Sequence, residues 1–409
     1  MTAADAPLPA TADAVIIGAG MVGAATAAAL AATGRRVCVI DRSGPFGGTT
    51  GAGEGNILVS DHLPGPDLSL ALRSLTLWRE FAAEHGAQFE FEAKGGVVVA
   101  HDQDQLAGLL DQAGRQRAAG VEVTGLDQAG LREAEPDLAP GLAGGAFYPQ
   151  DCQVQPMRAA MAYLALARRH GGLSVARAEA TGLEPATGNA PPCLVTDRGR
   201  IAAPVVVNAA GPWSGEVARR LGSDLPVRPR RGHILVTEPL PPVIGHKVYE
   251  CDYVAAVGRD DDALACSAVV ESTASGTVLI GSSRDFGGAL PGTGQRPAPP
   301  DAGVLAAMAR RAIALFPFLH RVRAIRAYTG YRPACRDHLP VIGPDPLVAG
   351  LYHATGHEGA GIGLAPATAE LLAGIIDGTA TAVDPAPFSP ARFAVPPART
   401  AGRHDRRPS

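Results

Sequence analysis

Residues 14–41 read AVIIGAGMVGAATAAALAATGRRVCVID, which is an apolar run, a glycine turn, an alanine-rich stretch and a second apolar run. The first run, 14–17, and the last, 37–40, are short and uncharged, as buried strands are. Residues 24–32 between them predict a helix that closes at Gly34. Strand, turn, helix and strand in this order form a right-handed βαβ unit, so the sequence predicts a parallel sheet.

The glycine turn has the spacing Gly18-x-Gly20-x-x-Gly23. Gly18 permits the tight turn, Gly20 lets the backbone approach a pyrophosphate, and Gly23 lets helix and strand pack closely. The helix N-terminus offers N–H groups and a positive dipole end to the phosphates. Asp41 ends the second strand, where it can accept hydrogen bonds from ribose hydroxyls. The pattern predicts a dinucleotide site for NAD or FAD, and the alternative is a glycine-rich loop without a ligand.

Two further glycine-rich segments can serve the same ligand. Residues 49–56, TTGAGEGN, offer hydroxyls and free N–H groups, and the alternative for them is a flexible surface loop. Residues 356–363, GHEGAGIG, precede a helix expected over 365–376. A second helix N-terminus there can direct its dipole at an electron-rich part of a cofactor, such as a reduced flavin ring.

The composition excludes several classes of protein. Of the 409 residues 46% are hydrophobic and 19% are charged, so the chain can bury a large core and is not dominated by disorder. Its length suggests two to three domains. With 36 basic and 40 acidic residues the net charge is −4, which argues against nucleic-acid binding through bulk positive charge.

The cysteines and the N-terminal residues predict a cytoplasmic protein. Six cysteines are scattered without a C-x-x-C pair, which indicates a reducing compartment and neither a disulfide framework nor a metal site. Asp5 and Asp13 lie where a signal peptide would be basic or apolar. The uncharged stretch 14–34 is better interpreted as strand, turn and helix than as a membrane span.

The rest of the chain predicts further helices and a second sheet. Helices are expected over 68–84, 103–119, 157–170 and 304–315, and a buried strand over 201–210. Short β runs at 233–237, 253–257 and 277–282, separated by Gly, Asp and Pro, predict an antiparallel sheet distinct from the parallel one. Residues after Phe388 are rich in Pro, Arg and Ala and predict a loosely attached tail.

Seven segments together resemble the D-amino-acid-oxidase-like (DAO) superfamily of FAD-dependent amine oxidoreductases, and they follow one another over residues 14 to about 378. The nearest likeness is to its glycine oxidase, hydroxyproline dehydrogenase and opine oxidase β-subunit branch. The segments are 15–41 of the glycine turn, TTGAGEGN at 49–56, VVVNAAGPWSGEVARRLG at 205–222, VRPRRGHILVTEP at 227–239, ASGTVLIGSSRDF at 274–286, GYRPACRDHLPVIGPDP at 330–346 and HATGHEGAGIGLAPATAELLAGII at 353–376.

The resemblance implies an α/β fold, with a doubly wound Rossmann-like FAD-binding domain interleaved with an α+β substrate domain that contains a mostly antiparallel sheet. We expect the FAD-binding domain to be discontinuous. The expected ranges are 12–80, 150–225 and 325–385 for the FAD-binding domain, 81–149 and 226–324 for the substrate domain, and 386–409 for a C-terminal tail.

The resemblance also implies the chemistry. Such an enzyme oxidises the CH–NH bond of a small amino acid or cyclic secondary amine to an imine, by hydride transfer to flavin N5. The substrate would be a D-amino acid, glycine- or sarcosine-like, or proline-like. The FAD would be non-covalent, because the sequence around Cys335 is not of the covalent type. The expected electron acceptor is oxygen, a quinone or a partner subunit, in a homo- or hetero-oligomer.

Two other readings stay open. An FAD monooxygenase would use NAD(P)H, although the sequence has no second GxGxxG unit. The chain could also be the flavin subunit of a hetero-oligomeric amine dehydrogenase. Some oxidase relatives use a lysine near the flavin to assist oxygen, whereas this chain has only Lys94 and Lys247 and carries Arg284 in its GSSRDF segment. That difference favours a dehydrogenase.

The resemblance assigns three catalytic candidates. Arg332 matches the position that holds a substrate carboxylate, which suits a guanidinium fork, and the alternative is an ion pair with Asp337. Tyr253 is expected to contact the substrate carboxylate or amine, or simply to pack. His357 is expected to touch the flavin or the substrate, or to serve backbone geometry alone.

Glu54 departs from the family, because many relatives carry a neutral residue in that loop. It would pair with a basic substrate group or turn to solvent, and Tyr331 is a further substrate-binding candidate. Trp213 resembles a packing residue and is included with the residues expected to bind the cofactor. These are Gly18, Gly20, Met21, Val22, Gly23, Asp41, Arg42, Thr49, Thr50, Gly53, Glu54, Gly55, Ala180, Ala210, Gly211, Trp213, Gly330, Gly356, His357, Gly359, Gly361, Ile362 and Gly363.

Overall fold

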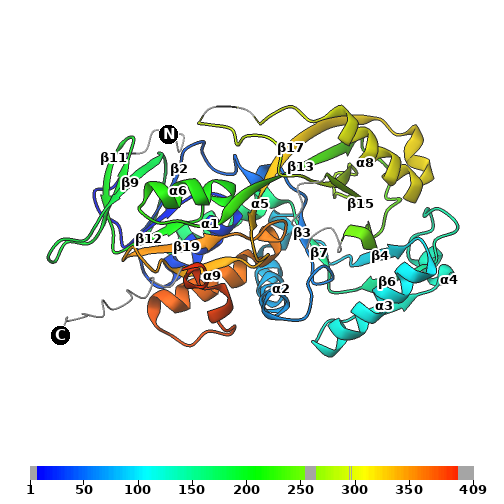
Figure 1. The fold of residues 1–409 in the computed structure, drawn as a ribbon, viewed down its shortest axis with the longest axis horizontal. Coiled ribbons are helices and arrows are strands. Elements are labelled where there is room, and N and C mark those ends of the chain that lie inside the picture. The colour runs from blue at the N-terminus through cyan, green and yellow to red at the C-terminus, as the bar shows by residue number, and fades with distance from the viewer. Residues whose placement is uncertain (1–6, 254–263, 294, 296, 395–409) are drawn as a thin grey trace, which may run out of the picture.

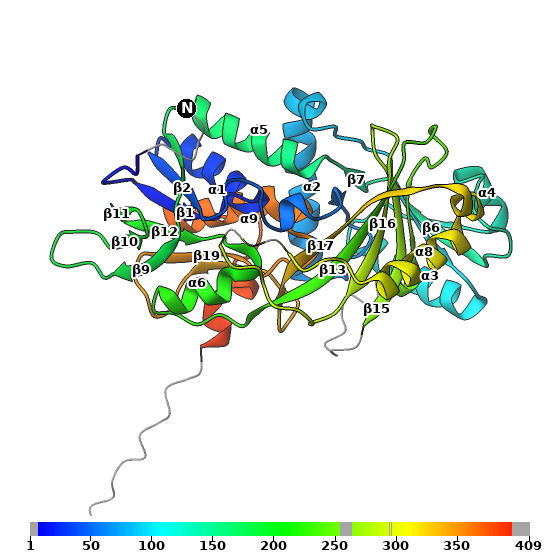
Figure 2. The same cartoon turned by 90° about the horizontal axis from the view of Figure 1, so that it is seen from above.

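The computed structural model describes residues 7–253, 264–293, 295 and 297–394. Two large sheets lie at opposite ends of an elongated molecule, joined by long strands that run between them (Figures 1 and 2). Among the described helices, none is both long and apolar enough to cross a bilayer.

A six-stranded sheet is built around the glycine turn. Its order is β18-β19-β12-β1-β2-β8, and all neighbouring strands are parallel except β18 and β19. The βαβ unit and the parallel sheet that the sequence predicts are therefore confirmed. The strands are β1 (Ala14–Ile17), β2 (Val37–Asp41), β8 (Leu173–Arg177), β12 (Val205–Asn208), β18 (Val341–Pro344) and β19 (Leu351–Thr355).

Both faces of this sheet are covered, which explains why its strands read as continuous apolar runs. Alternate residues face opposite sides. Ala14 and Ile16 join the core with the helices, whereas Val15 and Ile17 join the core with a three-stranded antiparallel sheet. The helices are α1 (Met21–Ala32), α2 (Pro66–His85), α5 (Pro156–Arg169) and α9 (Gly361–Asp377), and the covering strands are β9 (Ala180–Glu184), β10 (Cys193–Thr196) and β11 (Gly199–Ala202).

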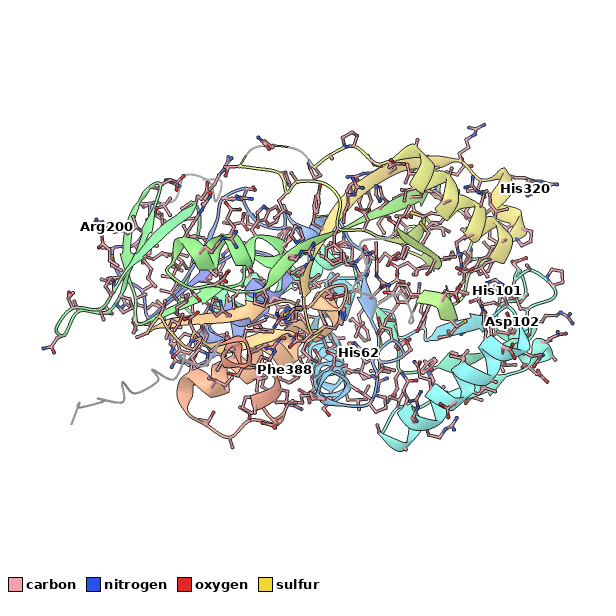
Figure 3. The ribbon with its side chains drawn as sticks, in the orientation of Figure 1. His62, His101, Asp102, Arg200, His320 and Phe388 are labelled. Atoms are coloured by element: carbon pink, nitrogen blue, oxygen red, sulfur yellow. The ribbon has the colours of Figure 1, made fainter. Side chains whose placement is uncertain are left out.

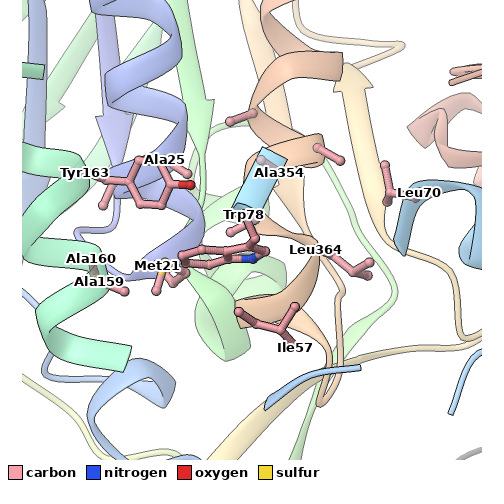
Figure 4. Close-up of a cluster of buried hydrophobic side chains, with 14 of the residues drawn as sticks. Met21, Ala25, Ile57, Leu70, Trp78, Ala159, Ala160, Tyr163, Ala354 and Leu364 are labelled. Carbon is pink, nitrogen blue, oxygen red and sulfur yellow. The ribbon is translucent and has the colours of Figure 1, made fainter. Parts of the chain in front are cut away.

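Trp78 on α2 anchors the helical layer. Its ring is fully buried and lies edge-on to Tyr163 of α5, 5.7 Å between ring centroids. Met21 of α1 and Leu364 of α9 lie beside it (Figure 4). The indole Nε1–H donates to the carbonyl of Gly363 at 3.0 Å, so this side chain fixes the first turn of α9 against α2.

The second sheet has eight strands in the order β17-β13-β16-β15-β14-β4-β6-β5. All pairs are antiparallel except β14 with β4, so the predicted mostly antiparallel sheet is confirmed. The strands are β4 (Gly96–Ala100), β5 (Thr124–Leu126), β6 (Gly144–Tyr148), β13 (Val227–Thr237), β14 (Lys247–Glu250), β15 (Ala265–Ser272), β16 (Val278–Arg284) and β17 (Ala324–Cys335); helices α3 (Gln103–Ala118), α4 (Gln128–Ala134) and α8 (Ala302–Leu315) pack on it.

Strands β13 and β17 connect the two ends of the molecule. They pair from Val227 opposite Cys335 to Thr237 opposite Ala324. Figure 2 shows them running from the eight-stranded sheet toward the six-stranded one. The structure places β17, most of which lies in the range expected for the FAD-binding domain, in the eight-stranded sheet. The domain boundaries stay a prediction.

Three local predictions were wrong. The single strand over 201–210 is two strands in different sheets, β11 and β12, because Pro204 between them has no N–H for a ladder. Tyr253 lies in a helical turn and not in a strand, and residues 254–257 lie outside the described ones. Within the described part of the tail, residues 389–394 are not loose: Pro390 is buried and Arg392 pairs with Asp337 at 2.7 Å, next to Phe388, which is fully buried near α9 (Figure 3).

Candidate active site

One large cavity lies between the two sheets. Its empty volume, counted out to its open mouth, is about 1620 Å³. A dinucleotide and a small substrate together suit such a space. The predicted residues that line it are Gly18, Gly20, Met21, Val22, Asp41, Arg42, Thr49, Thr50, Gly53, Glu54, Ala180, Ala210, Gly211, Trp213, Tyr253, Gly330, Tyr331, Arg332, His357, Gly359, Gly361 and Ile362.

Four predicted glycines do not line the cavity and instead allow close packing around it. A Cβ on Gly23 would lie 1.9 Å from the carbonyl oxygen of Gly18, and a Cβ on Gly55 would lie 1.8 Å from that of Val154. Gly356 packs on Val341, and Gly363 packs on the backbone of β3 (Asn56–Ile57). These four glycines therefore shape the backbone around the cavity and are not part of its lining.

The glycine turn is shaped to receive a phosphate. Gly18 has a φ of +112°, and a Cβ there would lie 2.4 Å from the carbonyl oxygen of Ala209, so only glycine fits. Asp41 accepts hydrogen bonds from the N–H groups of Ala19 (3.0 Å) and Ser43 (2.8 Å). Burial raises the pKa of Asp41. Its carboxylate lines the cavity beside the turn, as a ribose-binding residue would.

Residues 49–56 are not a surface loop, because they lie between α1 and β17. Thr50 Oγ1 accepts the N–H of Met21 at 2.9 Å, and Thr49 Oγ1 donates to the carbonyl of Tyr331 at 2.6 Å. The alternative of a flexible loop was wrong. The segment links the glycine turn to the strand that carries Arg332.

Trp213 and Arg42 form one rim of the cavity. The Arg42 guanidinium lies over the Trp213 ring, 4.8 Å from its centroid, and both side chains donate to the carbonyl of Pro291. Trp213 is only half-buried and lines the cavity. It is more than the core packing residue that the sequence suggested.

His357 lies at the N-terminal end of α9 in an apolar environment. Its Nε2 is 2.9 Å from Thr368 Oγ1. Burial lowers the pKa of His357 to about 4, so the imidazole is neutral near pH 7. This geometry holds the turn before α9 in place and directs the helix N-terminus, through Gly359 and Gly361, at the cavity.

Arg332 presents an unneutralised guanidinium to the cavity. It donates to the carbonyl of Ser283 at 2.9 Å and lies 3.4 Å from Ser282 Oγ, and within the described residues it forms no ion pair. The predicted alternative partner, Asp337, pairs instead with Arg392 at 2.7 Å. Burial and the nearby Arg284 lower the pKa of Arg332 to about 10, so it stays charged near neutral pH.

Tyr253 lies between the cavity and Arg284. The Arg284 guanidinium is 4.4 Å from the centroid of the Tyr253 ring and donates to its carbonyl at 3.2 Å. Tyr253 therefore both packs and lines the cavity. Tyr331 also lines it, but its hydroxyl donates to the carbonyl of Ala289 at 3.1 Å, which leaves mainly its ring for contact.

Glu54 is buried, so the alternative that it turns to solvent was wrong. Its Oε2 accepts from Asn56 Nδ2 at 3.1 Å and lies 3.9 Å from Lys247 Nζ. Lys247 donates to Glu271 at 2.5 Å and to Asn56. Sequence reasoning missed Asn56, Lys247 and Glu271. Only the rarity of lysine singled out Lys247, and nothing in the sequence placed it behind Glu54.

The residues present fit FAD. The glycine turn, Asp41, the segment 49–56 and the N-terminus of α9 line one continuous space. Within the described part of the chain, no group of three or more His, Cys, Asp or Glu residues is arranged to hold a metal ion.

Comparisons with known proteins identify the family. The DAO family, described as FAD dependent oxidoreductase, matches residues 13–375. Glycine oxidase of Geobacillus kaustophilus is 29% identical over 92% of this chain and 96% of its own. Hydrogen cyanide synthase subunit HcnC of Pseudomonas aeruginosa is 29% identical over 83% of this chain and 77% of its own.

Solved structures give the same result. The glycine oxidase of G. kaustophilus superposes with a TM-score of 0.82 at 28% identity, over 95% of this chain and all of that one (100%). L-proline dehydrogenase from P. horikoshii has the same fold, with a TM-score of 0.82 at 24% identity over 94% and 98% of the two chains. The chain belongs to the DAO family of FAD-dependent oxidoreductases.

Proposed function

We propose that this enzyme oxidises the CH–NH bond of a small amino acid or cyclic secondary amine to an imine. The observation that carries this proposal is the Arg332 guanidinium, which lines the cavity without an ion-pair partner among the described residues. A charged group in such a place is costly unless a ligand neutralises it. A carboxylate is the group that a guanidinium fork binds best.

Bound along the glycine turn, FAD supplies an electron-pair acceptor for the hydride of the substrate. The chain's own residues hold the substrate. Arg332 fixes its carboxylate, while Ile234 and the Tyr253 ring line the space beside it and exclude water. His357 is neutral near pH 7 and hydrogen-bonded to Thr368, so we assign it a role in positioning α9 and no role in acid–base catalysis.

Replacement of Arg332 tests the proposal. Arg332→Met removes the group that binds the carboxylate. The rate constant of anaerobic flavin reduction, divided by the dissociation constant of the amino acid, should therefore fall at least about 100-fold. Flavin content should stay that of the wild type. Arg115→Met is the matched control, because Arg115 is an exposed residue of α3 paired only with Asp111 along the same helix. Loss of flavin together with activity in Arg332→Met would contradict the assignment.

A second arrangement follows from one comparison. HcnC is a subunit of hydrogen cyanide synthase, so we also consider this chain as the flavin subunit of a complex. The acceptor would then be that partner, and otherwise oxygen or a quinone. Native mass and the rate of flavin reoxidation in air separate these cases.

The cytoplasmic location stays a prediction, and all six cysteines are free.

A further inference from the structure

The buried carboxylate of Glu54 has an oxygen without a partner in the cavity. Oε1 of Glu54 is buried and forms no hydrogen bond, whereas Oε2 is held by Asn56. Glu54 as a whole is 9% exposed and lines the cavity. A buried carboxylate oxygen left without a donor costs free energy. A donor group of a bound ligand would satisfy this oxygen.

The charges around Glu54 favour a cation. Glu54 and Glu271 share one ammonium group, that of Lys247, and all three side chains are at least nine-tenths buried. These three groups together carry one more negative than positive charge when Glu54 is ionised, and Arg332, which also acts on Glu54, offsets that charge until a substrate carboxylate binds its guanidinium. A positively charged ligand group beside Oε1 restores the balance.

The position of Glu54 relative to Arg332 sets the distance between two ligand groups. A Cβ on Gly281 would lie 2.2 Å from Glu54 Oε1, and Arg332 bonds to Ser283 and contacts Ser282. The Glu54 carboxylate and the Arg332 guanidinium thus contact neighbouring residues of the same strand, β16. A ligand that reaches both carries its carboxylate and its amine close together, as an α-amino acid does.

We propose that Glu54 binds the substrate ammonium group through Oε1 and takes up its proton. This inference rests on the proposed amine oxidation. In the step, an N–H bond of the ammonium breaks, an O–H bond forms on Glu54, and the electron pair stays on nitrogen. The amine is then neutral, and its lone pair assists loss of hydride from the adjacent carbon. Lys247, Asn56 and Glu271 are positioning residues that hold Oε2 and leave Oε1 facing the ligand.

An inert ligand pair tests the binding half without turnover. 2-Aminoisobutyrate has no α-hydrogen and cannot be oxidised, and pivalate replaces its ammonium by a methyl group. In the flavin-loaded protein, Glu54→Gln should weaken 2-aminoisobutyrate about 10- to 100-fold, measured by perturbation of the flavin spectrum. The affinity for pivalate should stay within about threefold or increase. Glu184→Gln, at an exposed pair with Arg200, is the control.

Equal effects of Glu54→Gln on both ligands, or no effect on either, would overturn the proposal. This result is distinct from failure of the proposed function, in which no amine reduces the wild-type flavin although the ligand pair is still discriminated. The retained flavin spectrum and pivalate binding show that the variant folds.

The pH profile of anaerobic flavin reduction tests the proton transfer. The charged or titratable groups that face Glu54 are Lys247 of β14, Glu271 of β15, Tyr328 and Arg332 of β17, and Tyr253 of the helical turn after β14. In Glu54→Gln, the flavin-reduction rate divided by the substrate concentration should rise with pH as the fraction of free amine in solution rises. In the wild type, the same rate should depend less on pH. Identical profiles would show that Glu54 does not accept the proton.

Discussion

Gly232 leaves the space that the Arg332 guanidinium occupies. A Cβ at residue 232 would lie 2.4 Å from Nη1 of Arg332, 2.9 Å from Cζ and 3.0 Å from Nη2. Gly232 pairs with Gly330 and Arg332 pairs with Arg230, so the contact runs diagonally across the β13–β17 ladder and is fixed by its register. The glycine diagonal to Arg332 thus leaves room for the position that the guanidinium takes.

Gly232→Ala should move the guanidinium and weaken binding of carboxylate ligands at least about tenfold, while flavin content stays unchanged. Gly182→Ala is the matched strand control, because a Cβ there meets nothing within 4 Å. The dissociation constant of pivalate, followed through the flavin spectrum, is the measurement. Wild-type affinity in Gly232→Ala would show that the fork does not need this space.

At the level of single residues, the sequence could identify Arg332, Glu54 and the glycine turn because each lies in a local motif. It could not identify Lys247 and Glu271 as neighbours of Glu54. They lie on β14 and β15, about two hundred residues away in the chain, and come together only through strand register. A shift of one residue in either strand would turn these side chains to the other face.

Helix α1 meets β1 with almost no space between the two backbones. Gly23 is in the first turn of α1, and a Cβ there would lie 1.9 Å from the carbonyl oxygen of Gly18. The helix N-terminus, which we propose to hold the phosphates, is thereby placed over the glycine turn. The packing of one element positions a whole binding surface.

Gly23→Ala should force α1 away from the turn, lowering the free energy of unfolding by about 1–3 kcal/mol and weakening FAD retention. Gly108→Ala makes the same change in α3, where a Cβ meets nothing within 4 Å. It should raise the free energy of unfolding by about 0.5–1 kcal/mol, because glycine is the poorer helix former. Denaturant titrations compare the two, and a neutral Gly23→Ala would contradict the packing argument.

His62 ties the segment before α2 to the start of that helix (Figure 3). Burial lowers the pKa of His62, but Asp67 and Asp61 outweigh it and raise the value to about 9. A raised pKa means that the stabilisation is complete below the unfolded value of about 6.5 and is lost as pH rises through about 9.

The melting temperature of the wild type should therefore fall between about pH 6.5 and 9, and His62→Gln should lack part of this fall. His320→Gln, at an exposed histidine, should follow the wild type. Parallel curves for the wild type and His62→Gln would show that His62 is not charged in the folded state.

At the level of elements, most helices and the βαβ unit were predictable because their periodicity is local. The long strands were not. Only residues 233–237 of β13 were expected as a strand. The first half of β13 contains three arginines and Pro229, which lies opposite Pro333 of β17, and such residues do not read as a strand. The change of sheet at Pro204 was also hidden, since residues 201–210 read as one apolar run.

On the scale of the whole molecule, the cavity joins the two sheets. Its lining comes from the glycine turn at one end and from β13 and β17 at the other. A ligand that fills it contacts both, so binding stabilises the assembly as well as the site. The order of the family motifs predicted this interleaved arrangement. The contacts between the two sheets around the cavity could not be predicted from the sequence.

Removal of FAD should lower the melting temperature by several degrees, and added FAD should restore it in a concentration-dependent way. NAD should not replace FAD. Differential scanning calorimetry of the flavin-depleted protein, with either dinucleotide added, measures this effect. Equal stabilisation by NAD would place a different cofactor in the cavity.

The central claim is tested most directly by the visible spectrum of the purified protein during anaerobic addition of D-, L- and N-alkyl amino acids, prolines included. The account predicts a flavin band that bleaches with at least one of these amines. A flavin that no amine reduces, but that NADH or NADPH does, would contradict amine oxidation and favour a monooxygenase.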